Sequence, residues 1–217
     1  MRGTIILNSI FLIFLFFACD SSKSEKSDKL PILGHFDVIS EDEGDYKKGD
    51  TIFHKVPDFE YLTQDSVILK SNQIEGKIWI AKFFFSNCPT ICPPMTSSMK
   101  KLRDDLSQFD DQIFYLSFSI DPKNDSSSRL REYIAEHQIN NTKNWYFLTG
   151  VPEQKTHELG TNGFLINAFS DDNAPGGYAH SPNFILVDQK RQIRGLYDGL
   201  EPSEIEQLKI DLQKLIK

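Results

Sequence analysis

Hydrophobic residues in the middle of the chain form strand-length runs that alternate with helix-spaced stripes. The run Ile78–Phe85, IWIAKFFF, is nearly continuous, as is typical of a central strand buried on both faces. After a loop, residues 95–109 carry apolar side chains three and four positions apart, which predicts a helix. Residues 112–121 predict a second buried strand, and residues 125–137 predict a helix that begins near Asp125 or Ser126.

The flanking segments predict shorter elements. Residues 33–49 lack a clear period and fit an edge strand or a loop, whereas residues 54–77 predict two short strands. Further elements follow as a strand over 144–150, a helix over 151–160 ended by Gly160, a hairpin over 182–199 and an amphipathic helix over 202–216. This order predicts an α/β, thioredoxin-like fold, in which helices flank a central mixed sheet and a β-hairpin extends from the N-terminus.

The N-terminus departs from this globular pattern. Residues 1–18 hold one arginine and then an apolar run that ends at Ala18, just before Cys19. The run is too short to span a bilayer and predicts a lipoprotein-type signal peptide, cleaved so that Cys19 carries the lipid. An uncleaved anchor and an ordinary secretory signal remain alternatives, since Phe16 and Phe17 are bulky for a lipoprotein signal.

The N-terminal pattern also predicts domain organisation and location. Residues 19–50 would form a lipid-anchored tether and N-terminal extension, with the polar stretch 20–34 as its flexible part, and residues 51–217 the folded domain. The expected location is a bacterial membrane, facing the periplasm. The formal net charge of −7 over 217 residues, without a basic run, argues against nucleic acid as a partner.

Two of the three cysteines lie in the loop after the first central strand. Pro89 keeps Cys88 extended, and prolines after Cys92 are tolerated in a first helical turn, which places Cys92 near a helix N-terminus. The helix dipole there favours a thiolate. Two soft thiolates with an imidazole suit Cu(I), whereas a structural zinc site normally needs four ligands. A plain disulfide staple and a redox pair are the alternatives.

One of the five histidines stands out as a third ligand. His180 lies in a Gly/Pro-rich loop directly before a buried strand, and in a thioredoxin-like fold that loop packs beside the cysteine loop. The other histidines fit structural or solvent-exposed positions better; they are His35, His54, His137 and His157.

Four motifs together resemble the SCO/SenC family of copper proteins. They are FFFSNCPTICPPMTSSMKKL, SFSIDPKNDS, YAHSPNFILVD and IRGLYDG, and the resemblance runs from about Thr51 to the C-terminus. It implies a thioredoxin-like domain that binds copper, as Cu(I) and in some states Cu(II), through Cys88, Cys92 and His180. Asp121 matches an acidic position near the site, where it would orient a ligand or handle protons.

The resemblance also implies a role and a partner. Members help to build the CuA centre of cytochrome c oxidase, so the expected partner is the oxidase's copper-binding subunit or another copper protein. Thr90 and Ala179 stand where many members have Asp, which could alter affinity or redox potential.

Two functions follow from these residues. The first is a copper metallochaperone, and the second is a thiol–disulfide oxidoreductase that acts on a partner's cysteines through Cys88 and Cys92. A peroxidase is disfavoured, since the cysteine loop shows no arginine to assist peroxide cleavage.

Overall fold

A seven-stranded mixed sheet forms the centre of the computed structural model, which describes residues 29–216. Its strand order is β11-β10-β5-β6-β7-β3-β4, with β5, β6 and β7 parallel and the other pairs antiparallel. The mixed sheet predicted from the sequence is therefore confirmed. The strands are β3 (Glu60–Thr63), β4 (Ile68–Lys70), β5 (Ile78–Phe84), β6 (Ile113–Ser119), β7 (Trp145–Thr149), β10 (Asn183–Val187) and β11 (Ile193–Asp198).

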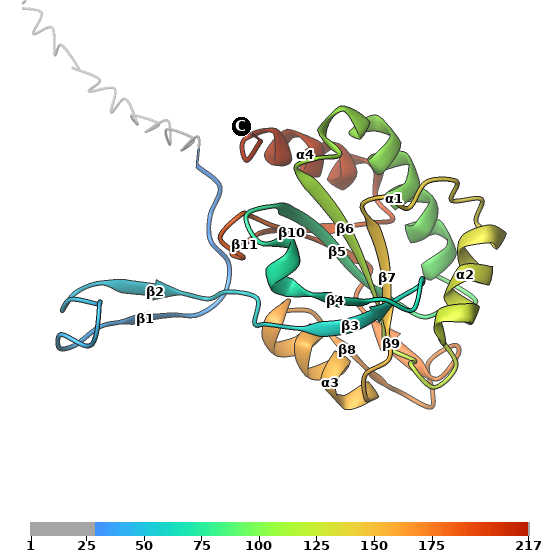
Figure 1. The fold of residues 1–217 in the computed structure, drawn as a ribbon, viewed down its shortest axis with the longest axis horizontal. Helices are drawn as coiled ribbons and strands as arrows, with labels where there is room; N and C mark the ends of the chain where they lie inside the picture. The colour runs from blue at the N-terminus through green and yellow to red at the C-terminus, as the bar shows by residue number, and fades with distance from the viewer. Residues whose placement is uncertain (1–28, 217) are drawn as a thin grey trace, which may run out of the picture.

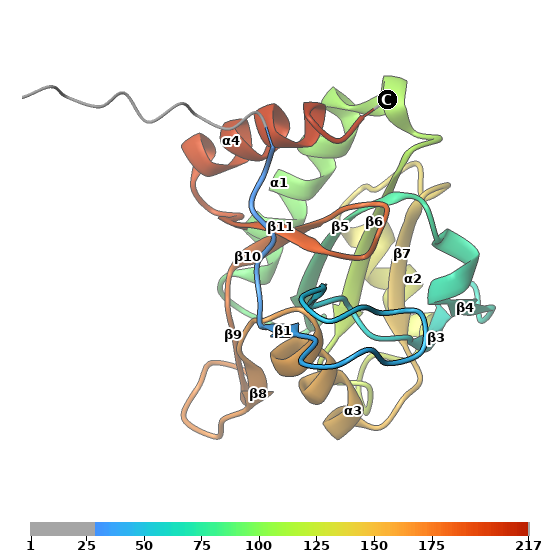
Figure 2. The ribbon, with the colours of Figure 1, turned by 90° about the vertical axis from the view of Figure 1, so that its left-hand side faces the viewer.

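Helices cover the sheet, and α1 and α4 lie side by side (Figure 2). The predicted start of the second helix is confirmed, because the Ser126 side chain caps it by accepting a hydrogen bond from the Arg129 amide. The helices are α1 (Cys92–Asp105), α2 (Ser127–Glu136), α3 (Glu153–Glu158) and α4 (Pro202–Gln213), with 3₁₀ turns at Ser71–Ile74 and Ser107–Phe109.

Strand β5 is buried along its whole length, and successive side chains enter opposite layers of the core. Phe84 contacts Tyr133 of α2, with ring centroids 5.3 Å apart. Phe83 points the other way and stacks on Phe118 of β6 at 5.1 Å. This two-sided burial explains the continuous apolar run and anchors the loop that follows β5.

The sequence pattern predicts that Gly160 ends the third helix, and this prediction is wrong. The chain continues past it in a π-helical turn, Leu159–Gly163. A Cβ atom on Gly160 would lie 3.3 Å from the Phe83 ring and from the Ala168 side chain. The glycine therefore allows this turn to pack closely against the core, and its role is close approach rather than helix termination.

The N-terminal extension is a separate two-stranded hairpin that projects from the body of the molecule (Figure 1). It pairs β1 (Phe36–Val38) with β2 (Thr51–Phe53). Before the hairpin, the chain lies against the sheet. The Leu33 amide donates a hydrogen bond to the Ile193 carbonyl at 2.8 Å, and Leu30 is buried. The sequence predicts a flexible tether over residues 20–34, but its last residues, 30–33, are held against β11.

The predicted signal peptide and the lipidated Cys19 lie outside the described residues. Within residues 29–216, none of the helices has the length and apolar character needed to cross a membrane.

Candidate metal centre

The cysteine loop leaves the carboxyl end of β5 and leads directly into α1. The Cys88 amide donates to the Phe85 carbonyl at 3.3 Å, which closes the turn after the strand. Cys92 is the first residue of α1, and Pro93 and Pro94 occupy its first turn, where no amide donor is needed. Both cysteines are buried and unpaired. The predicted position of Cys92 at a helix N-terminus is thus found in the fold.

His180 reaches the cysteines from a hairpin that the sequence pattern did not predict. It ends β9 (Tyr178–His180), which pairs with β8 (Ala168–Ser170), whereas the sequence favoured a loop here. The Phe85 ring packs edge-on against the imidazole, at a centroid distance of 6.2 Å. Nε2 of His180 then lies 3.2 Å from Sγ of Cys92.

These three residues bring together one possible ligand atom each. The two sulfurs and the imidazole nitrogen all lie within 4.8 Å of one another. Across residues 29–216, this is the only group of three or more His, Cys, Asp or Glu side chains with metal-binding geometry. The group has three members, which suits a three-coordinate soft ion better than a four-coordinate structural zinc.

The backbone fixes the tautomer of His180. Nδ1 lies 3.1 Å from the Ser181 carbonyl, which can only accept a hydrogen bond, so Nδ1 carries the proton. In the neutral imidazole, Nε2 then presents its lone pair to Cys92. A second hydrogen bond of this kind is the usual way in which a ligating histidine is oriented.

The two thiols differ in acidity. The hydrogen bond from Cys92 is the largest cause of the lowered pKa of Cys88. Burial raises the pKa of Cys92, and the neighbouring Cys88 thiolate raises it further. Burial therefore outweighs the helix dipole that had been expected to favour a Cys92 thiolate, and the reduced pair holds one thiolate, on Cys88, and one thiol, on Cys92.

Asp121 lies in the neighbourhood of the site, without touching the three residues. Its carboxylate accepts hydrogen bonds from the Tyr178 hydroxyl at 3.2 Å and from the Asn124 amide at 2.8 Å. The Tyr178 ring packs on Phe85, 5.2 Å between centroids. Asp121 is thus linked to the strand that carries His180 through Tyr178. Thr90, which stands where many SCO/SenC members have Asp, places its hydroxyl 3.7 Å from Sγ of Cys88.

The other four histidines have local partners instead. His54 is hydrogen-bonded to the Gly163 carbonyl and packs against His35, while His157 and His137 bond to the backbone carbonyls of Ile120 and Tyr133.

A buried polar cluster behind Cys92 was missed in the sequence. Lys82 of β5 is completely buried and donates to Oγ1 of Thr96 at 2.6 Å, and that hydroxyl also bonds to Tyr133 at 2.7 Å. The sequence signal was a single lysine within the apolar run IWIAKFFF.

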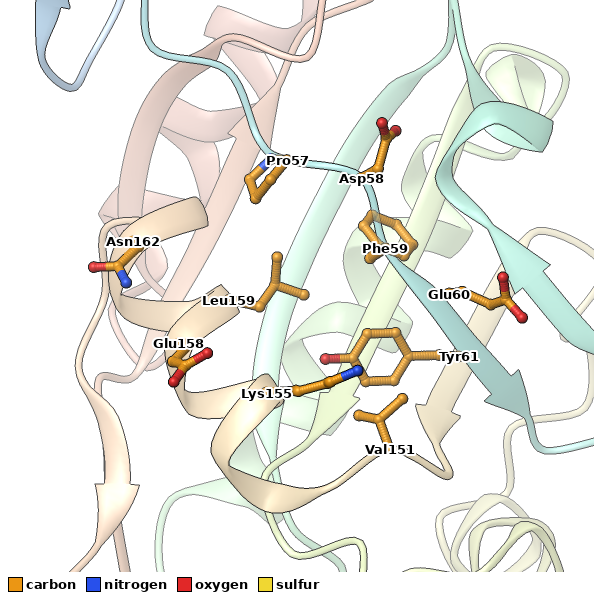
Figure 3. A pocket seen from close by; sticks show the side chains of 10 residues that line it. All are labelled: Pro57, Asp58, Phe59, Glu60, Tyr61, Val151, Lys155, Glu158, Leu159 and Asn162. Atoms are coloured by element: carbon orange, nitrogen blue, oxygen red, sulfur yellow. The ribbon is translucent and has the colours of Figure 1, made fainter.

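A separate pocket opens between β3 and α3, with a volume of about 470 Å³ (Figure 3). Tyr61, Lys155 and Glu158 are among its lining side chains, and it shares no residue with the cysteine–histidine group. It is therefore distinct from the candidate metal centre.

Known proteins resemble this chain in both sequence and fold. The crystal structure of a SCO1/SenC family lipoprotein from Bacillus anthracis is 29% identical, with a TM-score of 0.70 over 76% of this chain and 96% of that chain. BsSco, described as a member of the Sco family of cytochrome c oxidase assembly proteins with a disulfide switch, is 28% identical. Its TM-score is 0.66 over 75% of this chain and 93% of its own.

A third structure shares the fold at lower identity. Copper-bound ScoI from Bradyrhizobium japonicum is 15% identical, with a TM-score of 0.61 over 75% of this chain and 99% of that chain. The family model described as SCO1/SenC matches residues 47–217, which is most of the chain and includes both cysteines and His180. The chain therefore belongs to the SCO1/SenC family.

Proposed function

We propose that this protein is a copper metallochaperone that holds Cu(I) between Cys88, Cys92 and His180. The observation that carries the proposal is the convergence of two thiol sulfurs and one imidazole lone pair within 4.8 Å. Thiolates and imidazole are the ligands that Cu(I) prefers, and three of them satisfy a three-coordinate ion. Copper-bound ScoI, which has the same fold, supports the choice of metal.

Loading and release follow from the protonation of the pair. Cys88 enters as a thiolate, and Cys92 gives up its proton as its sulfur binds the ion, so uptake releases about one proton near neutral pH. The disulfide has no thiolate to offer, so copper binding requires the reduced pair. Transfer would proceed by ligand exchange, with a thiolate of the recipient displacing one ligand at a time.

The proposed recipient is the copper-binding subunit of cytochrome c oxidase, where the protein would deliver copper to the CuA centre or prepare it. Another copper protein remains the second candidate. BsSco, a similar structure, belongs to a family of oxidase assembly proteins, which favours the first. The similar Bacillus anthracis protein is a lipoprotein, which favours a lipid on Cys19 and membrane anchoring, with the domain facing the periplasm.

A Cu(I) titration of the reduced protein against a competing chelator tests the metal site. Wild type should bind one Cu(I) tightly, and His180→Ala should bind it more weakly. His35→Ala is the matched control, because that side chain is exposed on the segment that leads into the N-terminal hairpin. Weak binding by wild type that His180→Ala leaves unchanged would count against the copper proposal.

A thiol–disulfide oxidoreductase is the second candidate, favoured by the acidic Cys88 thiol. The Cys88 thiolate would attack a partner's disulfide, releasing one partner thiolate and forming a mixed disulfide. Cys92, on losing its proton, would attack Cys88 and release the second partner thiolate. This chemistry leaves the pair oxidised and the partner reduced, and it does not need His180. Exchange that fails in His180→Ala alongside copper binding would give His180 an acid–base or structural role.

A further inference from the structure

Lys82 is an unusual residue for the centre of a sheet. It lies in the middle of β5 with no exposed surface, on the layer that faces α1 and α2. A buried ammonium is costly unless it is paired, because it loses its hydration. Within residues 29–216 no carboxylate forms an ion pair with it, and its hydrogen-bond partner is the neutral hydroxyl of Thr96.

The immediate surroundings stabilise a positive charge only in part. Two aromatic rings lie near Nζ, with the centroid of Phe84 at 5.4 Å and that of Trp145 at 6.0 Å. The Thr96 hydroxyl is shared with Tyr133, which is itself buried. Cation–π contacts and one shared hydroxyl replace little of the hydration that the ammonium has lost. A full negative charge must come from elsewhere if Lys82 is charged.

The negative charges that act on Lys82 belong to the cysteine pair. Thr96 follows Cys92 by one helical turn, so their side chains lie on the same face of α1. Lys82, bonded to Thr96, is thus placed directly behind Cys92. Burial lowers the pKa of Lys82 to about 7, and the charges of Cys92 and Cys88 act against that shift. Burial raises the pKa of Cys92, and the charge of Lys82 acts against that rise.

We propose that the buried Lys82 ammonium is the counter-ion of the Cys88–Cys92 thiolates, and that it biases the site toward Cu(I) over Cu(II) and toward the reduced pair over the disulfide. The inference rests on the proposed function for its copper part. Two thiolates with Cu(I) leave one net negative charge, whereas with Cu(II) the charges cancel, and a disulfide is neutral. A positive charge on Lys82 behind Cys92 therefore stabilises the first of these states most.

The test compares Lys82→Met and Lys82→Gln with wild type, using the full-length protein in detergent at pH 6, where the Lys82 ammonium predominates. Both variants remove the charge, and the glutamine keeps a group that can hydrogen-bond Thr96. Lys77→Met is the matched control, because Lys77 precedes the same strand at the opposite end and bonds to the Asp111 carbonyl. The first readout is the affinity for Cu(I) and Cu(II) by chelator competition.

Removing the charge should weaken Cu(I) binding relative to Cu(II) by about tenfold, which corresponds to about 60 mV for the one-electron copper couple. The second readout needs no metal. In a glutathione buffer, two glutathione thiols reduce the Cys88–Cys92 disulfide to two thiols and become one glutathione disulfide. Loss of the charge should favour the protein disulfide about tenfold, or about 30 mV for this two-electron exchange.

Unchanged metal preference and unchanged disulfide potential in both variants would overturn the inference. A shift in Lys82→Met that Lys82→Gln does not share would also overturn it, since a hydrogen bond rather than a charge would then be responsible. If Lys82→Met fails to fold, Lys82→Gln decides alone. If wild type binds no copper, the metallochaperone proposal fails, and the glutathione equilibrium still decides the role of Lys82.

Discussion

Aromatic side chains are buried at the carboxyl end of β5 and exposed to solvent on the β1–β2 hairpin. At the end of β5, Phe83, Phe84 and Phe85 are at most 1% exposed and hold the cysteine loop against the core. On the hairpin, Phe36 is 59% exposed and its ring meets Phe53 across the two strands. Both regions are rich in aromatics, but only the first lies between two covering layers.

This difference determines what each region can do. A two-stranded hairpin without a covering layer contributes little stability, and its side chains can adjust. Metal ligands must keep their relative positions to within a fraction of an ångström. The two cysteines follow the buried strand β5 directly, and the buried Phe85 packs against His180 of the β8–β9 hairpin. Substitutions at the candidate site should therefore have much larger effects than substitutions on the β1–β2 hairpin.

The largest effect should come from the cysteines themselves. Cys88→Ser and Cys92→Ser each remove one of the two thiolate ligands. Loss of a group that only hydrogen-bonds a metal ligand lowers metal affinity by roughly 10–100-fold, so loss of a ligand itself should lower Cu(I) affinity by more. Chelator competition on the reduced proteins measures this. Full binding by either variant would show that the ion is not held between the two sulfurs.

A matched pair of phenylalanines tests the contrast in packing directly. Phe118 is completely buried among Phe59, Tyr61, Phe83 and Phe164, whereas Phe53 is 38% exposed. Phe118→Ala should lower the free energy of unfolding by about 3–5 kcal/mol, and Phe53→Ala by about 0.5 kcal/mol or less. Urea unfolding of the two variants measures both values. Similar losses would mean that the hairpin is packed against something in solution.

The buried charge behind the site gives a pH signature that the exposed hairpin should lack. The folded pKa of Lys82 is lowered to about 7, against 10.5 for the ordinary side chain. Between these values the unfolded chain keeps a proton that the folded protein has lost on Lys82, so the contribution of Lys82 to stability should rise with pH from about 7 to about 10.5.

The slope due to Lys82 should reach about 1.4 kcal/mol per pH unit and be absent in Lys82→Met. Unfolding is measured on both reduced proteins, because Cys88, Cys92 and Tyr133 face the same cluster and contribute to both curves. Parallel pH profiles would mean that Lys82 is not titrating in this range.

Local sequence patterns were enough to predict most of the sheet. They were not enough to predict the hairpin that brings His180 to the cysteines. The run over β5 and the cap at Ser126 are visible in neighbouring residues alone. The β8–β9 hairpin consists of two three-residue strands around a Gly/Pro-containing loop, too short to show a period. His180 meets Cys92 across 88 positions of sequence, and such contacts depend on the assembled fold.

Burial explains the remaining failures of the sequence patterns. Cys92 begins a helix, as predicted, yet its thiol is less acidic than expected, because a helix end favours a thiolate less than complete burial disfavours it. The sequence places Lys82 within an apolar strand, but only the fold reveals which helices carry its partners.

The smallest effect should come from Asp121 and Tyr178, which supply no ligand atom and act on the site through other residues. Asp121 is linked to the strand of His180 through the Tyr178 hydroxyl, and that hydroxyl also bonds to Glu153 at 3.3 Å. Asp121→Asn and Tyr178→Phe should each weaken Cu(I) binding by about tenfold or less, the lower end for loss of a supporting partner. Chelator competition on both single variants and the double variant measures this. If the two residues act through one hydrogen bond, the double variant should lose no more than the worse single variant, whereas additive losses would mean that Asp121 acts on the ion by another route, such as its own charge.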